Sequence, residues 1–152
     1  KILLYRRNYF KDDFIDMKRK IAYIINGLSD VVNLRGVTND IVDAYHDHSV
    51  YVMSSRTEGF PLVLIEAGIC GLPIVAYDCP SGPNEIVVHG ENGFLVSPVG
   101  NIKSMADYLM RLMSDKKLRQ QMGHKSVELS KRFQLENIAQ EWIQLYNQLL
   151  NS

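Results

Sequence analysis

Short apolar runs alternate with stretches of helical spacing along most of the chain, and this alternation constrains the fold more than any other feature. The run at 50–53 is continuously apolar, which is typical of a strand that a parallel sheet buries on both faces. Ile102, Met105 and Leu109 recur three or four positions apart, which indicates one face of a helix. By these criteria the predicted strands are 2–5, 31–35, 50–53, 73–77 and 94–96, and the predicted helices cover 14–28, 41–45, 61–70, 85–88, 102–113 and 138–149.

Strands that alternate with helices predict an α/β fold, with a doubly wound parallel sheet of the Rossmann-like kind. In such sheets a ligand binds beyond the carboxyl ends of the strands. The loops at 36–40, 54–60 and 78–84 follow predicted strands, so we expect them on one functional edge. A length of 152 residues suits one ordinary domain, and 1–152 is therefore interpreted as a single domain that includes the C-terminal helices at 102–150.

The charge balance argues against several classes of partner. The chain has 17 basic and 17 acidic residues, and a net charge of zero does not favour a nucleic-acid or anionic membrane surface. No apolar run approaches the roughly 18 residues that span a bilayer, so no transmembrane helix is expected. Two cysteines, Cys70 and Cys79, are too few for a disulfide framework. A reducing cytoplasm is the simplest setting for this composition.

Two glutamates flank the start of the helix predicted at 61–70. Glu58 lies in the loop before this helix, and Glu66 lies within it, eight positions later. The free N–H groups at a helix start attract phosphate, so a diphosphate would fit there with a ribose at Glu66 and a sugar at Glu58. The spacing alone also allows a plainer interpretation, in which Glu58 caps the helix and Glu66 is a solvated surface charge.

The setting of these glutamates, S-R-T-E-G-F-P-L-V-L-I-E-A at 55–67, resembles the signature of the family-4-type retaining glycosyltransferases, which have the GT-B fold. The segments at 71–86 and 89–96 are similar to the blocks that follow in that family. The helix at 102–113 and the closing aromatic helix resemble the family's C-terminal end. The resemblance covers nearly the whole chain and implies the family's C-terminal, donor-binding domain.

The resemblance implies a role for each matching residue. Glu58 matches the glutamate that contacts the donor sugar near the reacting carbon, and Glu66 matches the glutamate that holds the ribose. Gly36 and Val37 match the loop that borders the nucleobase. The backbone N–H groups expected to face the sugar and the diphosphate are those of Gly59, Phe60, Leu62 and Val63, and Arg56 is either a phosphate contact or the ion-pair partner of a neighbouring acid.

The start of the chain departs from the family pattern. The family's first strand–loop–helix unit carries an arginine and a lysine that neutralise the diphosphate, whereas this chain opens on what resembles the second strand. The domain is therefore expected to be incomplete at its N-terminal edge. Arg6 and Arg7 follow that strand where the family tends to place glycines, and they either replace the missing cations or reflect a rearranged start.

The resemblance also implies a reaction. The family transfers a hexose from a nucleotide-sugar with retention of anomeric configuration, and it uses no metal or other cofactor; a UDP-sugar is the first choice of donor and a GDP-sugar the second. The acceptor, a glycan or a lipid-linked molecule, normally binds an N-terminal domain, which would also carry any association with the inner face of the membrane. The chain alone is expected to bind the donor without turning it over. The alternative is a non-catalytic domain that binds nucleotide-sugars or mediates an interaction.

Three further features are interpreted as structural. His46-Asp47-His48 alternates possible metal ligands, but the sequence places no further ligand near it, so a helix end is the better interpretation. Cys70 and Cys79 are typical of small buried apolar residues. Trp142 and Tyr146 are expected to pack rather than to form a binding platform, with part of the last helix's apolar face exposed.

Overall fold

The computed structural model describes residues 2–4 and 40–151. Of these, residues 2–4 and 42–151 belong to one compact unit. The helix predicted at 14–28 and the strand predicted at 31–35 lie outside the described residues, as do Gly36, Val37 and the arginines at 6–7. The described part contains a parallel sheet, the helices from residue 41 onward and the loops that join them.

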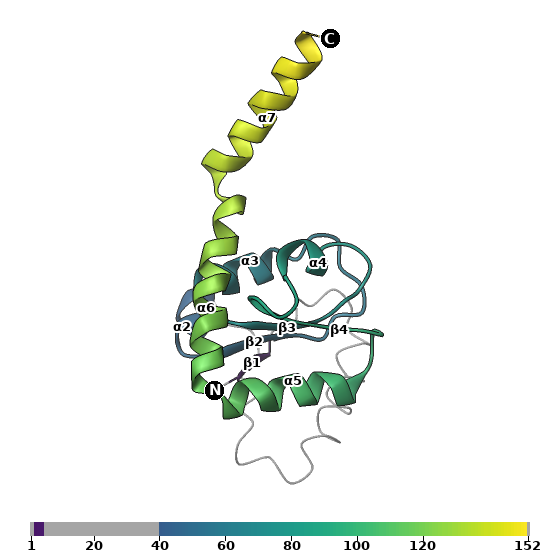
Figure 1. Ribbon diagram of the computed structural model, residues 1–152, viewed down its shortest axis with the longest axis vertical. Coiled ribbons are helices and arrows are strands. Elements are labelled where there is room, and N and C mark those ends of the chain that lie inside the picture. The colour runs from purple at the N-terminus through teal and green to yellow at the C-terminus, as the bar shows by residue number, and fades with distance from the viewer. Residues whose placement is uncertain (1, 5–39, 152) are drawn as a thin grey trace. The chain divides into compact units, whose positions relative to one another are not determined.

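Four parallel strands form the sheet, in the order β1-β2-β3-β4 (Figure 1). Val52 pairs with Leu4 on one side and with Val75 on the other, and Val75 pairs in turn with Phe94. All residues of β2 and β3 are buried, as expected for inner strands of a parallel sheet. The strands are β1 (Ile2–Leu4), β2 (Val50–Met53), β3 (Ile74–Tyr77) and β4 (Gly93–Val96).

Helices cover both faces of this sheet, as the sequence predicts (Figure 1). Helices α3 and α4 lie on one face and α5 lies on the other. Helix α6 contacts both α3 and α5, and α3 and α5 each contact β3. The described helices are α2 (Ile41–His46), α3 (Leu62–Ile69), α4 (Pro83–Ile86), α5 (Ile102–Ser114), α6 (Lys116–Ser130), the 3-10 turn η1 (Lys131–Phe133) and α7 (Leu135–Leu150).

A continuous core joins α5 and α6 to the sheet. Met105 and Leu112 of α5 and Met122 of α6 are buried in it. They pack with strand residues at alternate positions, because successive side chains of a strand point to opposite faces. These strand residues are Val50, Val52, Val75, Tyr77, Phe94 and Val96.

Most element boundaries follow local capping chemistry. The side chains of Asn101 and Asp115 accept hydrogen bonds from backbone N–H groups in the first turns of α5 and α6. The short helix α4 differs from its predicted range of 85–88, because it begins at Pro83 and ends two residues earlier. Proline favours the first position of a helix, and the Val88 N–H bonds to the Asn92 side chain at 2.8 Å.

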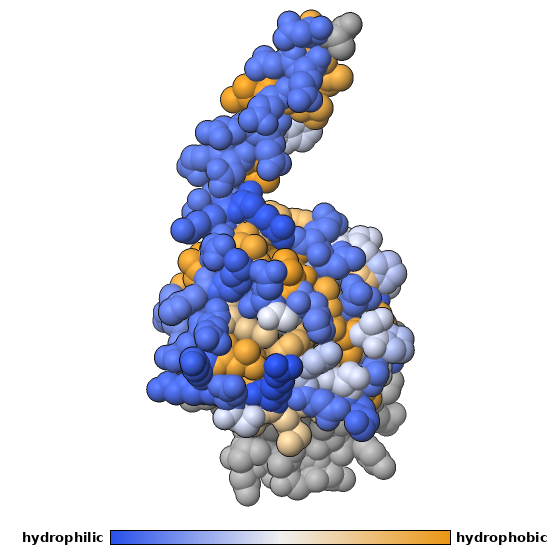
Figure 2. All heavy atoms as spheres, viewed as in Figure 1, coloured by the Kyte–Doolittle hydropathy of each residue, from blue (hydrophilic) through white to orange (hydrophobic). Residues whose placement is uncertain are grey.

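The last helix contributes nothing to the core. No residue of α7 is buried, and the side chains of Trp142 and Tyr146 are 54% and 57% exposed. Their rings contact each other, with centroids 5.9 Å apart, and the expected exposure of part of this helix's apolar face is confirmed. Figure 2 shows apolar residues at the surface of this helix. Within 2–4 and 40–151, no helix is both long and apolar enough to cross a bilayer.

Candidate functional site

Two loops meet at the carboxyl-end edge of the sheet. Because β2 and β3 are parallel neighbours, the loop that follows each of them leaves the same edge. Gly82 of the second loop has φ +92°, and a Cβ there would lie 2.4 Å from Pro61 Cδ and 2.6 Å from the carbonyl oxygen of Gly59. Only glycine tolerates this conformation together with this close approach. The predicted meeting of the loops at 54–60 and 78–84 is therefore confirmed, while the loop at 36–40 is described only at Asp40.

Glu58, in the first of these loops, is half-buried. Its neighbour is the buried Cys79 of the second loop. Burial raises the pKa of the Cys79 thiol, and the negative charge of Glu58 raises it further, whereas backbone N–H groups of Cys79 and Glu58 lower it. Glu58 thus lies near Cys79 of the second loop, three residues before the N-cap of α3.

The start of α3 leaves backbone donors open. Its N-cap residue is Pro61, and no side chain caps the helix, so the interpretation of Glu58 as a cap is wrong. Within the described residues, the N–H groups of Gly59 and Phe60 donate no hydrogen bond. The Leu62 N–H donates to the Phe60 carbonyl at 3.0 Å, and the Leu62 side chain is exposed.

Glu66 lies on the open side of α3. Leu62, Glu66 and Ile69 share one helical face, because they are four and three positions apart, and all three side chains are exposed. Oε2 of Glu66 accepts a hydrogen bond from the Tyr45 hydroxyl at 2.9 Å. Glu66 is therefore not only a solvated charge. Sequence reasoning missed Tyr45, since its spacing in α2 marks it only as an apolar residue.

Arg56 is exposed at the rim of the first loop. None of the ion pairs between described residues includes it. Its charge acts on Tyr77, at the end of β3. Burial raises the pKa of the Tyr77 hydroxyl, and the charge of Arg56 opposes this rise. The structure thus places a cation beside the carboxyl end of β3.

A segment far along the chain also borders this edge. The ring of Phe60 contacts Phe133 of η1 edge to face, with centroids 5.8 Å apart. The guanidinium of Arg132 lies 4.6 Å from the centre of the Phe133 ring and donates a hydrogen bond to the carbonyl oxygen of Glu85. No local pattern in the sequence predicts this contact, because Phe60 and Phe133 are far apart along the chain.

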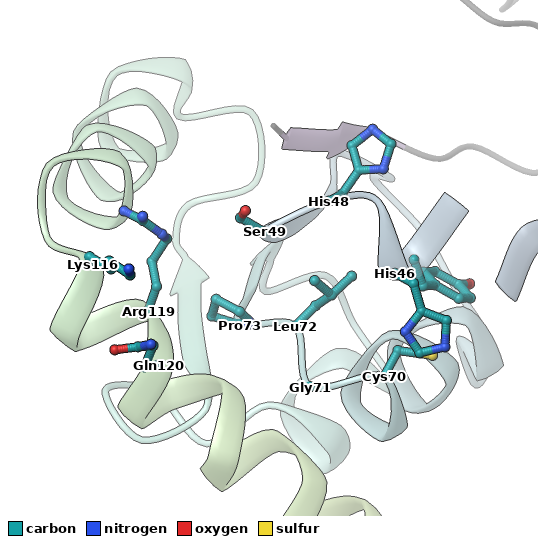
Figure 3. A pocket seen from close by; sticks show the side chains of 11 residues that line it. His46, His48, Ser49, Cys70, Gly71, Leu72, Pro73, Lys116, Arg119 and Gln120 are labelled. Atoms are coloured by element: carbon teal, nitrogen blue, oxygen red, sulfur yellow. The ribbon is translucent and has the colours of Figure 1, made fainter. Parts of the chain in front are cut away.

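The described cavities lie elsewhere. One, of about 260 Å³, lies at the amino-terminal edge, since Ser49 and Pro73 directly precede β2 and β3. Figure 3 shows Lys116 and Arg119 of α6 on one side of it and His46 on the other. A second cavity, of about 350 Å³, lies between α4, η1 and α7. Neither is lined by Glu58 or Glu66.

His46 and His48 lie at the end of α2. Nδ1 of His48 lies within hydrogen-bond distance of the Ala44 carbonyl oxygen, which the last turn of the helix leaves open. Across residues 2–4 and 40–151, no three His, Cys, Asp or Glu side chains gather in a way that would hold a metal ion. The interpretation of this motif as a helix end is confirmed.

Comparison with known proteins places these residues in a family context. The family description "Glycosyl transferases group 1" matches residues 18–128. An exopolysaccharide phosphotransferase of Streptomyces coelicolor is 40% identical over 126 residues, which are 82% of this chain and 13% of that protein. A poly(ribitol-phosphate) alpha-N-acetylglucosaminyltransferase of Staphylococcus aureus is 33% identical over 134 residues, which are 86% of this chain and 27% of that protein.

Solved structures are similar as well. The crystal structure of Anabaena HepE in complex with UDP matches with a TM-score of 0.80 at 26% identity, and the match covers 97% of this chain and 40% of that one. The chain therefore spans less than half the length of each of these three proteins. The matched residues include both loops of the candidate site and the whole of α3.

Proposed function

The chain belongs to the group 1 glycosyltransferase family, which has the GT-B fold, and we propose that it is the donor-binding part of a retaining hexosyltransferase. The observation that carries this proposal is the arrangement around the start of α3. Glu58, the open N–H groups of Gly59 and Phe60, and Glu66 follow one another along the loop and the exposed face of the helix. A sugar, a diphosphate and a ribose occur in the same order in a nucleotide-sugar.

The distances along the helix suit this ligand. Glu66 lies four residues beyond Leu62, which corresponds to about 6 Å of helix at about 1.5 Å per residue. Diphosphate oxygens at the helix start would accept hydrogen bonds from the Gly59 and Phe60 N–H groups and would benefit from the positive end of the helix dipole. The carboxylate of Glu66 would accept hydrogen bonds from the ribose hydroxyls.

The proposed reaction replaces one bond at the anomeric carbon with another. The bond from this carbon to the diphosphate oxygen breaks, and its electron pair leaves with the nucleoside diphosphate. An acceptor oxygen forms the new bond in the original configuration and releases its proton. Fixed N–H groups around the departing diphosphate stabilise its developing charge without reorganising, which is the main way such a site lowers the barrier. Glu58 contacts the sugar; we assign it no nucleophilic role.

UDP is the nucleotide we favour, with GDP second. The support is that Anabaena HepE was crystallised in complex with UDP and matches 97% of this chain. The acceptor we propose is a glycan or a lipid-linked molecule, by analogy with the transferase from Staphylococcus aureus whose acceptor is poly(ribitol-phosphate). We propose no metal cofactor, because the site offers backbone donors and Arg56 for the diphosphate.

We propose that a further domain supplies the acceptor site. The chain spans only 27% of the Staphylococcus aureus relative, so most of that enzyme has no counterpart here. The apolar side chains of α7 are exposed and would suit a contact with such a domain. This chain on its own is then expected to bind the donor and not to turn it over.

Calorimetric titration of UDP, GDP and ADP into the chain tests the donor site. UDP is expected to bind most tightly, and chelation of divalent ions by EDTA should leave its affinity unchanged. The variant Glu66→Ala should weaken UDP binding by about 1.5–3 kcal/mol, the range for hydrogen bonds to a charged group. Glu136→Ala, which removes an exposed glutamate of α7, is the matched control and should bind as the wild type does.

The sugar subsite needs a separate comparison. In Glu58→Ala the preference for a UDP-sugar over UDP should disappear, because the lost contact is to the sugar alone. An unchanged preference would remove Glu58 from the site. Absence of binding by all three nucleotides would remove the donor site itself.

A further inference from the structure

A side-chain hydrogen bond joins Tyr45 of α2 to Glu66 of the candidate site. The two residues are 21 positions apart, and the hydroxyl of Tyr45 lies 2.9 Å from Oε2 of Glu66. Tyr45 is only 1% exposed, whereas Glu66 is exposed. We propose that Tyr45 is a positioning residue, whose hydroxyl holds the Glu66 carboxylate in the orientation that receives the ribose. This inference rests on the proposed role of Glu66 in donor binding.

The tyrosine is a rigid donor. Its ring packs against the ring of Tyr51 of β2, with centroids 5.8 Å apart and planes tilted by 57°. Both rings are buried, and close packing leaves a buried ring one orientation. The hydroxyl at its tip is therefore fixed relative to the sheet. A hydrogen bond from such a hydroxyl to a carboxylate is charge-assisted, and it is stronger than a bond between neutral groups.

The glutamate, in contrast, would be mobile without this bond. An exposed glutamate on a helix has three rotatable side-chain bonds, and ordering it on ligand binding costs affinity. The bond from Tyr45 orders Glu66 before any ligand arrives. A carboxylate has about four acceptor positions, so Oε1 and the second lone pair of Oε2 remain for two ribose hydroxyls.

A purely structural role for the same bond makes different predictions. Glu66 would then serve only to satisfy the buried hydroxyl, and loss of the bond would lower stability without affecting nucleotide recognition. A positioning role requires instead that the effect of Tyr45 depends on the ribose hydroxyls and on Glu66. The two roles can be separated with one conservative substitution.

The test uses Tyr45→Phe, which removes the hydroxyl and keeps the buried ring. UDP and a dideoxy analogue that lacks both ribose hydroxyls are titrated into the wild type, Tyr45→Phe, Glu66→Ala and the double variant. Tyr45→Phe should weaken UDP binding roughly tenfold, from the lost pre-ordering and the lost charge-assisted bond. Tyr45→Phe should weaken binding of the dideoxy analogue by less than about twofold, because Glu66 then has no ribose hydroxyl to bind. In the Glu66→Ala background, Tyr45→Phe should also weaken UDP binding by less than about twofold, because the carboxylate that Tyr45 positions is absent.

Tyr108→Phe is the matched control. It also removes one tyrosine hydroxyl, but from a ring that stacks on Phe94 on the α5 side of the sheet. This variant should bind both nucleotides as the wild type does. The thermal unfolding midpoint of each variant is measured to check that the fold is retained.

A ligand-free measurement completes the test. Three-bond NMR couplings of Glu66 should report a single side-chain rotamer in the wild type and an average over rotamers in Tyr45→Phe. The inference is overturned by wild-type UDP affinity in Tyr45→Phe while Glu66→Ala binds weakly, or by rotamer averaging in the wild type. If the wild type binds no nucleotide, the proposed function fails, and the couplings still decide whether Tyr45 orients Glu66.

Discussion

Helices α6 and α7 are of nearly equal length, with 15 and 16 residues, but they relate to the rest of the molecule in opposite ways. Helix α6 buries Met122, Gly123, Ser126 and Ser130. Helix α7 buries no residue, although it carries the more regular apolar stripe. The helix with the weaker stripe is thus the one that packs.

Small residues explain the packing of α6. A Cβ on Gly123 would lie 2.3 Å from the carbonyl oxygen of Gly71, and a Cβ on Gly68 would lie 2.4 Å from Oγ of Ser130. Glycines at both positions let α6 approach α3 closely. Oγ of Ser126 also donates to the Asn92 carbonyl oxygen at 3.1 Å, which ties α6 to the turn before β4. An apolar stripe therefore indicates that a helix has a face that could be buried. Small residues such as Gly68 and Gly123 instead mark where two helices pack closely together.

The largest expected difference between the two helices is in the cost of removing an apolar side chain. Met122→Ala should lower the free energy of unfolding by about 3 kcal/mol, because it leaves a cavity in the core under α6. Leu145→Ala in α7 should change it by less than about 0.5 kcal/mol, because that side chain is already 44% exposed. Urea unfolding followed by circular dichroism measures both values. Equal losses would mean that α7 is buried in solution.

A smaller effect is expected from filling the space between α6 and α3. Gly123→Ala improves helix propensity by about 1 kcal/mol. The clash with the Gly71 carbonyl should outweigh this gain and give a net loss of about 1–2 kcal/mol. Gly59→Ala is the control for stability, because nothing lies within 4 Å of its added Cβ. A stabilised Gly123→Ala variant would show that α6 is not held as closely as the structure indicates.

The smallest effect is the contribution of Cys70 to the pH dependence of stability, on the side of the molecule that α6 covers. Burial raises the pKa of the Cys70 thiol, at the end of α3, above its ordinary value of 9.0, and the charge of Glu66 raises it further. The protonated thiol therefore contributes its full stability below pH 9.0, and this contribution is lost as the pH rises from 9.0 through the folded-state pKa. Thermal unfolding between pH 8 and pH 11 should show a decline that Cys70→Ala reduces. Helix α7 contains no cysteine, so its deletion should leave this decline intact.

The sequence was sufficient for much of the fold. The run at 50–53 became β2 with the predicted bounds, and Gly71 ends α3 with φ +76°, as a glycine after a helix commonly does. Cys79 is buried as predicted, whereas Cys70 is only partly buried. The exposed apolar face of α7 was expected in part, but spacing defines a helical face and not the surface that covers it, so the sequence could not show that no residue of α7 is buried.

Part of the candidate site could also be predicted from the sequence, and part could not. The order of Glu58, Gly59 and Glu66 along the chain, and their position after an inner strand, could be read from the sequence because a strand, a loop and a helix follow one another locally. The roles of Gly36 and Val37 stay predictions, since both lie outside the described residues. The contact of Phe60 with Phe133 depends on where η1 lies in space, and no local pattern specifies that.

The sequence by itself determined the parallel α/β class, the family, and the loop and helix on which the proposed donor site is built. These features depend on periodicity, turn residues and a local motif, all of which act over a few neighbouring positions. Only the tertiary structure decided that Tyr45 bonds Glu66 across 21 positions and that Arg132 bonds the backbone of Glu85 across 47. It also decided that Gly82 packs against Pro61 and that α7 has no buried face. Such contacts depend on the packing of whole elements against one another, which the spacing within each element does not specify.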